Sequence, residues 1–490
     1  MRESGVLLPI FSLPSDYGIG CFSKEAYEFV DQLYEAGQKK WQILPLGPTG
    51  YGDSPYQSFS TFAGNPYFID LHQLKMDGLL TAEELKNLDF GKDETSIDYE
   101  KLYNVRYKVL AKAFERFVAD EAYENYIRDN AFWLEDYSLF MAEKDEHNGM
   151  PWTLWEEPLK HREEWILVQE KARLEKQCAF HKFQQYQFWK QWNSLHGYAN
   201  RKGIEIIGDI PIYVALDSAD TWASPQLFQF NENLEPVAVA GCPVDGFSAT
   251  GQLWGNPLYN WTYHKETGYD WWIRRINYML HMYDVLRVDH FRGFDEYYAI
   301  PYKDKTAEFG HWEKGPGMDL FNAIKEAIGE QKIIAEDLGY MTDSVRQLVL
   351  DTGFPGMKVL QFAFDSREES DYLPHNYDKN CVVYTGTHDN DTIQGWYDSM
   401  NDHDREFSVR YMNNKRTPRT ELHTDFVRMA MASVADLCII PIQDYLGLGR
   451  EARINTPSTL GDNWKWRLKK GEITDIVIDG IRELSKLYGR

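Results

Sequence analysis

The sequence predicts an α/β fold, a (β/α)8 TIM barrel with a largely helical insertion after the second strand and long strand-end loops. Three observations predict it: eight short apolar segments, amphipathic helical segments between them, and a gap of about 160 residues between Leu44 and Ile206. Short runs that are apolar on both faces are typical of buried parallel strands. Eight of them indicate a closed barrel, and a doubly wound sheet is the competing arrangement of the same pattern.

The predicted strands are rich in β-branched residues, and most end in a polar or acidic residue. They span residues 5–9, 41–45, 204–209, 285–289, 333–336, 359–364, 382–388 and 437–441. A helix is predicted after the first of them, because apolar residues recur at helical spacing behind Ser23 and Gly37 supplies a stop. These apolar residues are Ala26, Phe29, Val30 and Leu33.

Two interruptions of the strand-and-helix pattern are expected. Residues 70–200 predict a mainly helical inserted subdomain, with a capping box at Thr81 and Glu84 and helical periods over 101–117 and 180–195. Residues 231–260 are rich in Gly, Pro and Asn and predict an active-site loop insertion over a strand end. Because no linker divides the chain, residues 1–490 are expected to form a single catalytic barrel domain.

Composition excludes several classes of protein. The 490 residues carry a net charge of −24, which would repel phosphate backbones, so no nucleic-acid partner is expected. No apolar stretch reaches the roughly 18 to 20 residues of a membrane span, and the N-terminus has no export signal. The five cysteines are dispersed without a CxxC pair, which favours reduced thiols and a cytoplasmic location. No metal-binding or nucleotide-binding motif is present, so no metal and no cofactor are expected.

The first candidate catalytic residue is Asp289, at the end of the predicted strand 285–289. Side chains on a strand alternate, so Arg287 and Asp289 point the same way. A guanidinium beside this carboxylate would lower its pKa and hold it ionised, as a carboxylate nucleophile requires. The alternative is a plain salt bridge at a barrel end.

The second candidate is Glu336, in the segment Lys332-Ile-Ile-Ala-Glu-Asp337. Neighbouring carboxylates on a strand alternate in direction, so only one of Glu336 and Asp337 can face the barrel axis. Proximity to Asp289 would raise the pKa of Glu336 and suit it to general acid catalysis. The alternative is that the acidic pair caps the following helix.

The third candidate is Asp389, which follows His388 where the strand 382–388 ends. An ionised Asp389 could stabilise positive charge at an anomeric carbon, and His388 could donate to a sugar hydroxyl. One His-Asp pair is a weak signal by itself. Three acids at three strand ends are the stronger signal, because barrel enzymes carry their chemistry on that one face.

Four motifs give a family resemblance: GDIPIYV at 208–214, RVDHFRG at 287–293, AEDLG at 335–339 and GTHDN at 386–390. They resemble the strand ends of the α-amylase superfamily, and more narrowly those of the amylomaltases, the 4-α-glucanotransferases of glycoside hydrolase family 77. The segments 46–58, 252–257 and 455–466 fit that family as well. Cys21 stands where the family often has an acidic residue, and the insertion carries no recognisable signature.

The resemblance implies a retaining transfer of α-1,4-glucan segments to the 4-OH of another glucan or maltooligosaccharide. Asp289 would be the nucleophile, Glu336 the acid and then the base, and Asp389 the transition-state stabiliser, with nucleophile and acid about 5 to 5.5 Å apart. It further implies a set of substrate-binding residues: Arg287, His388, Asp209, Tyr56, Trp254, Ser54, His290, Gln252 and Asn455.

Two other functions compete with glucan transfer. An amylase-type hydrolase would use the same three acids and pass the glucan to water, so the acceptor site has to discriminate between the two. A barrel that only binds glucan is disfavoured, because none of the three acids is missing.

Overall fold

The computed structural model describes residues 2–50, 52–244, 250–339 and 341–490. Its centre is an eight-stranded parallel sheet in the order β10-β11-β12-β1-β2-β3-β6-β9. The main-chain N–H of Ala335 donates to Pro355 O at 3.0 Å and joins the two edges of the sheet, so that it is nearly closed into a barrel. The strands are β1 (Glu3–Leu7), β2 (Lys40–Gln42), β3 (Glu205–Pro211), β6 (Val285–Asp289), β9 (Ile333–Ala335), β10 (Gly356–Val359), β11 (Cys381–Tyr384) and β12 (Leu437–Pro441). The predicted barrel is confirmed.

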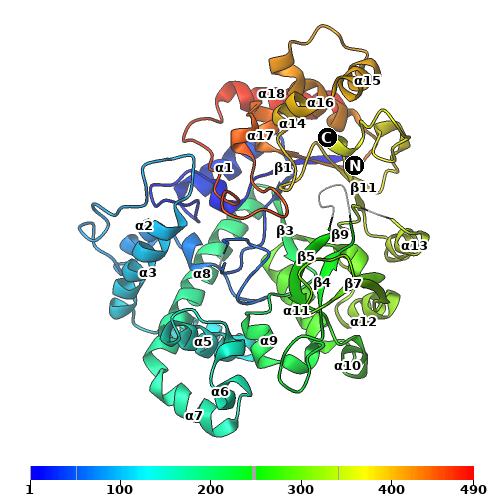
Figure 1. The fold of residues 1–490 in the computed structure, drawn as a ribbon. Helices are drawn as coiled ribbons and strands as arrows, with labels where there is room; N and C mark the ends of the chain where they lie inside the picture. The colour runs from blue at the N-terminus through cyan, green and yellow to red at the C-terminus, as the bar shows by residue number, and fades with distance from the viewer. Residues whose placement is uncertain (1, 51, 245–249, 340) are drawn as a thin grey trace.

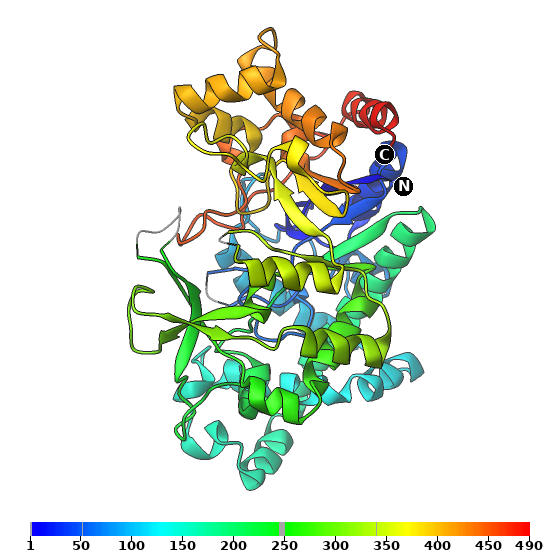
Figure 2. The same cartoon turned by 90° about the vertical axis from the view of Figure 1, so that its right-hand side faces the viewer.

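Helices surround the sheet, and the chain ends meet beside it. Helix α1 (Lys24–Glu35) buries the four apolar residues predicted for it and is followed by Gly37 at a φ of 73°. The two termini lie side by side in both views (Figures 1 and 2), where Arg490 Nη1 donates to Glu3 O at 3.0 Å. The remaining barrel-side helices are α9 (Ala219–Ala223), α10 (Trp261–Glu266), α11 (Asp270–Met282), α12 (Met318–Ile328), α13 (Asp343–Thr352), α14 (Ile393–Ser399), α15 (Asp402–Met412), α16 (Leu422–Ala432), α17 (Ile442–Leu446) and α18 (Asp475–Tyr488).

The chain between β2 and β3 is mainly helical, as expected. Part of this region forms a second apolar cluster together with α9, and this cluster includes Trp133, Phe140, Trp152 and Trp222. Helix α8 also contributes Phe183 and Trp192 to the barrel core, so it joins the insertion to the barrel. Helices α5 to α7 lie at the opposite end of the molecule from α15 and α16 (Figures 1 and 2). The helices of the insertion are α2 (Leu71–Met76), α3 (Tyr99–Arg116), α4 (Glu121–Asp129), α5 (Ala131–Glu146), α6 (Glu157–Lys160), α7 (Glu164–Arg173) and α8 (Glu175–Arg201).

The region 231–260 is not one long loop. Its described part contains β4 (Ala238–Cys242) and β5 (Gln252–Pro257), which pair in an antiparallel sheet of order β5-β4-β7-β8 with β7 (Glu296–Pro301) and β8 (His311–Lys314). The strands were not predicted, because a high content of Gly and Pro is typical of loops. Residues 245–249 of the predicted insertion lie outside the described residues.

Two further local predictions were wrong. The strand predicted at 359–364 is β10 at Gly356–Val359, followed by a 3-10 helix over Leu360–Phe362. Its apolar character has another cause, because Ala363 and Phe364 pack against Phe426 of α16. The capping box also forms without a helix: Thr81 N donates to Glu84 Oε2 at 2.9 Å, within a turn. No helix in the described part of the chain combines the length and the apolar character needed to cross a membrane.

Candidate active site

The three predicted acids come from three strands of the barrel and from the same end of each. Asp289 is the last residue of β6, and Glu336 directly follows β9, which pairs with β6. Asp389 lies five residues beyond β11. The carboxyl ends of parallel strands open on one face of the barrel, so the strands direct all three acids to that face.

The carboxylate of Asp289 is bound by Arg287 on the same strand, at 3.0 Å between Nη2 and Oδ1. Burial nevertheless raises the pKa of Asp289 to about 6, and the opposing effect of the Arg287 charge is the smaller one. The expectation that Arg287 would lower this pKa below its ordinary value was therefore wrong. Burial outweighs the effect of Arg287, and the negative charge of Asp209 adds to the rise. Arg287 also binds Asp209, through Nη1 at 2.8 and 2.7 Å. Its positive charge is shared between two carboxylates.

Glu336 accepts two main-chain hydrogen bonds. His290 N donates to Oε2 at 2.7 Å, and Leu338 N donates to Oε1 at 3.0 Å. His290 reaches this place in the left-handed backbone region, with φ 56° and ψ 48°. Burial raises the pKa of Glu336 to about 8, and the negative charge of Asp289 adds to the rise. Glu336 therefore holds a proton at neutral pH, and burial contributes more to this than proximity to Asp289.

Asp389 is held by residues that follow β12. Asn455 Nδ2 donates to Asp389 Oδ1 at 2.6 Å, and Arg453 Nη2 donates to Asp389 O at 2.7 Å. The other carboxylate oxygen, Oδ2, lies 3.4 Å from His388 Nε2. This arrangement occupies one oxygen of Asp389 and leaves the other beside His388.

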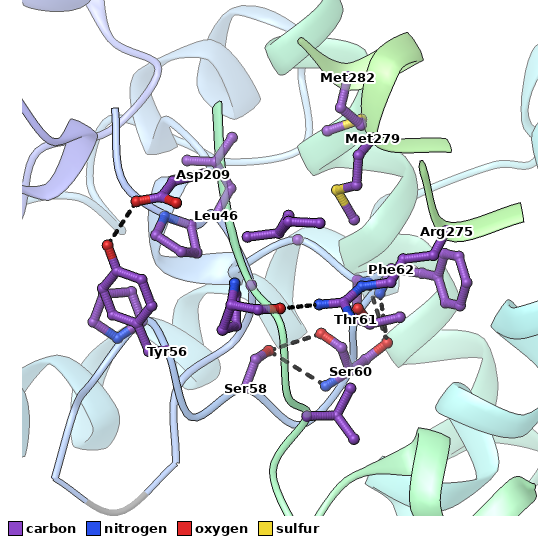
Figure 3. A pocket seen from close by; sticks show the side chains of 18 of the residues that line it. Leu46, Tyr56, Ser58, Ser60, Thr61, Phe62, Asp209, Arg275, Met279 and Met282 are labelled. Atoms are coloured by element: carbon purple, nitrogen blue, oxygen red, sulfur yellow. Dashed lines mark hydrogen bonds between the residues drawn. The ribbon is translucent and has the colours of Figure 1, made fainter. Parts of the chain in front are cut away.

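Tyr56 connects two more predicted residues. Its hydroxyl donates to Asp209 Oδ2 at 2.7 Å and lies 3.4 Å from His388 Nδ1 (Figure 3 shows the contact with Asp209). The rings of Tyr56 and His388 stack at 5.0 Å between centroids. Ser54 Oγ accepts from Tyr56 N at 3.3 Å and so helps to shape this loop. Tyr56, Asp209, Arg287 and Asp289 thus form one continuous chain of hydrogen bonds.

Trp254 and His290 lie together beside the end of β6. Their ring centroids are 4.8 Å apart in an edge-to-face arrangement, and Trp254 Nε1 donates to Gln252 Oε1 at 3.1 Å. Burial lowers the pKa of His290 to about 4, so its ring is neutral at pH 7. Its Nε2 is buried and has no hydrogen-bond partner among the described residues. A neutral imidazole edge beside an indole is suited to a sugar hydroxyl and a sugar face.

Tyr56 and Asp209 help to line a small pocket (Figure 3). It has a volume of about 50 Å³ and is lined by the loop 55–64 and by Arg275, Met279 and Met282 of α11. At ~10–15 Å³ for each water, this volume suits a few waters and is too small for a sugar ring. The pocket adjoins the candidate site, because Tyr56 and Asp209 belong to both. Among the described residues no cluster of three or more His, Cys, Asp or Glu could hold a metal ion.

Sequence reasoning missed two kinds of contributor. The main-chain N–H groups of His290 and Leu338 carry no signal in a side-chain motif, although His290 directly follows Asp289. Arg453 was also missed, because 64 residues separate it from Asp389. Its place just before Asn455 was the only available signal.

The chain was compared with known proteins. The family model described as 4-alpha-glucanotransferase, Glyco_hydro_77, matches residues 8–474. A 4-alpha-glucanotransferase of Clostridium butyricum is 50% identical over 485 residues, covering 98% of this chain and 99% of the relative. One of Thermus thermophilus is 47% identical over 484 residues, covering 96% of each chain.

Solved structures agree with these relatives. The amylomaltase from Streptococcus agalactiae in complex with acarbose has a TM-score of 0.97 and 43% identity, and the match covers all of both chains. The amylomaltase from Corynebacterium glutamicum shares the fold at a TM-score of 0.76 and 19% identity, covering 98% of this chain and 73% of the other. The chain therefore belongs to the 4-alpha-glucanotransferase family, the amylomaltases, and is an enzyme of that class.

Proposed function

We propose that Asp289, Glu336 and Asp389 carry out the glucan transfer by a retaining double displacement. In the first step Glu336 gives its proton to the glycosidic oxygen while an oxygen of Asp289 attacks the anomeric carbon. The glycosidic bond breaks, the reducing-end fragment leaves, and a glycosyl ester forms on Asp289. A separation of about 5 to 5.5 Å between the two carboxyl groups belongs to this mechanism, because no water has to fit between them.

In the second step the 4-OH of an acceptor glucose or maltooligosaccharide gives its proton to Glu336. The acceptor oxygen attacks the anomeric carbon, the ester bond to Asp289 breaks, and the stereochemistry of the donor is restored. The observation that carries the assignment is that Asp289 ends β6 and Glu336 follows the paired strand β9 at the same end of the barrel. The pKa values of the two acids agree with it. With Asp289 at about 6 and Glu336 at about 8, one acid is largely ionised and the other largely protonated at pH 7.

Asp389 has the third role, electrostatic stabilisation of the positive charge that develops at the anomeric carbon. Its Oδ2 lies beside His388, and both face the donor sugar in this proposal. The donor subsite further includes Asp209, Arg287 and Tyr56, joined by the hydrogen bonds described above.

The acceptor side is formed by Trp254 and His290. The indole of Trp254, which His290 contacts edge to face, supports stacking on a sugar ring. Gln252, Ser54 and Asn455 complete the proposed substrate-binding set. Since a relative was solved with acarbose, we expect this site to bind acarbose as well as linear α-1,4-glucans.

Around this site, we propose a single catalytic domain over 1–490, with 70–200 as an inserted helical subdomain flanking the cleft and 231–260 as a border of the active site. We also propose a cytoplasmic location. The five cysteines are free, as expected for a protein in a reducing compartment. Cell fractionation tests the location.

Incubation with maltotriose, followed by separation of the products, tests the reaction. Transfer gives glucose together with chains longer than maltotriose, whereas hydrolysis gives only shorter sugars. Asp289→Ala should remove both products, so turnover near the parent rate would contradict its assignment as nucleophile. A glycosyl-protein adduct detected by mass spectrometry in Glu336→Gln given an activated glucosyl donor would identify Asp289 directly.

A further inference from the structure

The chain after β12 passes over the loop that carries His388 and Asp389. We call residues 450–464 the C-terminal strap. Asn455 binds the loop twice, through its main-chain N–H to His388 O at 3.1 Å and through its side chain to Asp389 Oδ1 at 2.6 Å. The strap therefore contacts both the backbone and the carboxylate of the loop.

Arg453 lies at the centre of these contacts. Its Nη2 donates to Asp389 O at 2.7 Å, and its Nε donates to Asn455 O at 2.7 Å. One planar guanidinium thus ties the backbone of Asp389 to the residue that binds the Asp389 carboxylate. Guanidinium groups have a rigid, planar fork of donors, and the ammonium group of a lysine does not reproduce that geometry.

Both ends of this arrangement are anchored. Arg450 Nε donates to Asp391 Oδ2 at 2.7 Å, two residues beyond Asp389. At the other end Trp464 N donates to Ile454 O at 2.8 Å, and the Trp464 ring lies 5.8 Å from that of Tyr56. Trp464 has a φ of 65°, so the strap turns back on itself in the left-handed region. The strap is therefore held beside the donor side of the site.

We infer that Arg453 is a positioning residue for Asp389, acting through the Asp389 main-chain carbonyl and through Asn455. The inference rests on the proposed role of Asp389 as the stabiliser of the transition state. Asn455 takes Oδ1 of Asp389, so Oδ2 is the oxygen directed at the sugar, and Arg453 fixes the position of both groups. Displacement of Asp389 weakens an interaction that matters most when charge develops at the anomeric carbon.

A positioning role for Arg453 and a purely structural role in anchoring the strap predict different kinetics. Loss of Arg453 should lower kcat and leave KM nearly unchanged, because ground-state sugar contacts are retained. Anchoring alone would lower the melting temperature or raise KM as the cleft loosens. A positioning role therefore predicts a change in kcat, and an anchoring role predicts a change in Tm or KM.

The experiment compares the full-length parent with Arg453→Met, Arg453→Lys and Arg419→Met in maltotriose transfer, with Tm measured alongside. Arg419 is the control because its Nε also donates to a carboxylate, Asp398 Oδ1 at 2.8 Å, but on the surface. We expect Arg453→Met to lower kcat roughly tenfold to hundredfold, the scale of a small misplacement of a catalytic group. Lysine should recover part of the loss, and Arg419→Met should match the parent.

A folded Arg453→Met enzyme that loses less than about fivefold in kcat overturns the inference, and so does a loss confined to KM. If Arg453→Met does not fold, Arg453→Lys takes its place, and a folded Arg453→Lys enzyme with the kcat of the parent overturns the inference. A further arm adds Arg453→Met to Asp389→Asn. Since Arg453 is inferred to act through Asp389, the double variant should be no slower than Asp389→Asn; multiplied losses contradict that route.

The Asp389→Asn variant distinguishes failure of the proposed role of Asp389 from failure of the inferred role of Arg453. If Asp389→Asn keeps near-parent kcat, the proposed role of Asp389 fails. If Asp389→Asn is inactive but Arg453→Met is near parent, only the inference on Arg453 fails.

Discussion

Arg287 binds both oxygens of Asp209 through one nitrogen, at 2.8 and 2.7 Å, and both side chains are almost fully buried. The remaining arm of the guanidinium holds Asp289. A buried cation between two carboxylates leaves the group of three with a net negative charge. Burial of this charge keeps the pKa of Asp289 at about 6, although an arginine lies in direct contact.

The first prediction concerns Arg287 itself. Arg287→Met should lower the free energy of unfolding by about 3–5 kcal/mol, because it leaves Asp209 buried without its partner. It should also raise the pKa of Asp289 and move the acidic limb of the kcat/KM profile to higher pH. Arg287→Lys keeps the charge, so its acidic limb should stay nearer to the parent's. Chemical denaturation and pH-dependent kinetics check this, and an unmoved acidic limb in Arg287→Met would contradict it.

The second prediction concerns the hydroxyl of Tyr56. Tyr56→Phe keeps the ring stacked on His388 but removes the hydrogen bond to Asp209, so transfer should fall roughly tenfold, the equivalent of about 1.4 kcal/mol. Tyr198→Phe is the matched control, since Tyr198 donates to Asp31 Oδ1 at the same 2.7 Å on the far surface. Steady-state kinetics on maltotriose compares them. Equal activities of the two variants would show that the Tyr56 hydroxyl is not needed.

The third prediction is the pH dependence of catalysis. The proposed mechanism requires Asp289 ionised and Glu336 protonated, so kcat/KM should rise through about pH 6 and fall through about pH 8. His290 should add no limb within this range, because burial keeps its pKa at about 4. Initial rates with maltotriose between pH 5 and 9 test this. A rate that still rises beyond pH 9 would contradict Glu336 as the proton donor.

The fourth prediction is the effect of Glu336 on stability. The pKa of Glu336 is raised from its ordinary value of 4.5 to about 8 in the folded protein. Between these two pH values the folded protein keeps a proton that the unfolded chain releases. The free energy of unfolding contributed by this group therefore falls as pH rises through that window. Glu336→Gln removes the dependence, so it should be inactive but have a higher Tm than the parent.

The stability gain of Glu336→Gln should be larger at pH 9 than at pH 5, where the parent residue is already protonated. Differential scanning calorimetry at both values measures it. Glu326→Gln, an exposed substitution on α12, serves as the control. The linkage argument fails if the Glu336→Gln gain is the same at both pH values.

The fifth prediction concerns Trp254 and the choice between sugar and water. Trp254→Ala should weaken acceptor binding and raise the share of hydrolysis, because the stacking surface is lost while the three acids are untouched. The share of hydrolysis is measured as the ratio of glucose released from maltotriose to the longer chains formed. Trp165→Ala, which removes a tryptophan that is 56% exposed on α7, is the control. If Trp254→Ala leaves the ratio of glucose to longer chains unchanged, Trp254 does not contribute to acceptor binding.

Local sequence signals were enough for much of this protein. The runs of β-branched residues predicted the barrel, since a strand buried on both faces is apolar throughout, and Val285–Asp289 and Leu437–Pro441 were located to the residue. The candidate acids Asp289 and Glu336 were proposed from the same pattern, because each stands where such a run ends. Such patterns can be recognised in the sequence because each depends only on residues that are neighbours along the chain.

Only the tertiary structure decided the electrostatics and the supports of the site. The pKa of Asp289 depends on Asp209, 80 residues away along the chain and bound to the same guanidinium. Likewise, Asn455 and Arg453 reach Asp389 only because β12 lies beside β11. Sequence determines which groups are present, but burial and charge sharing depend on which distant segments meet, and these set the protonation of the acids and the orientation of Asp389.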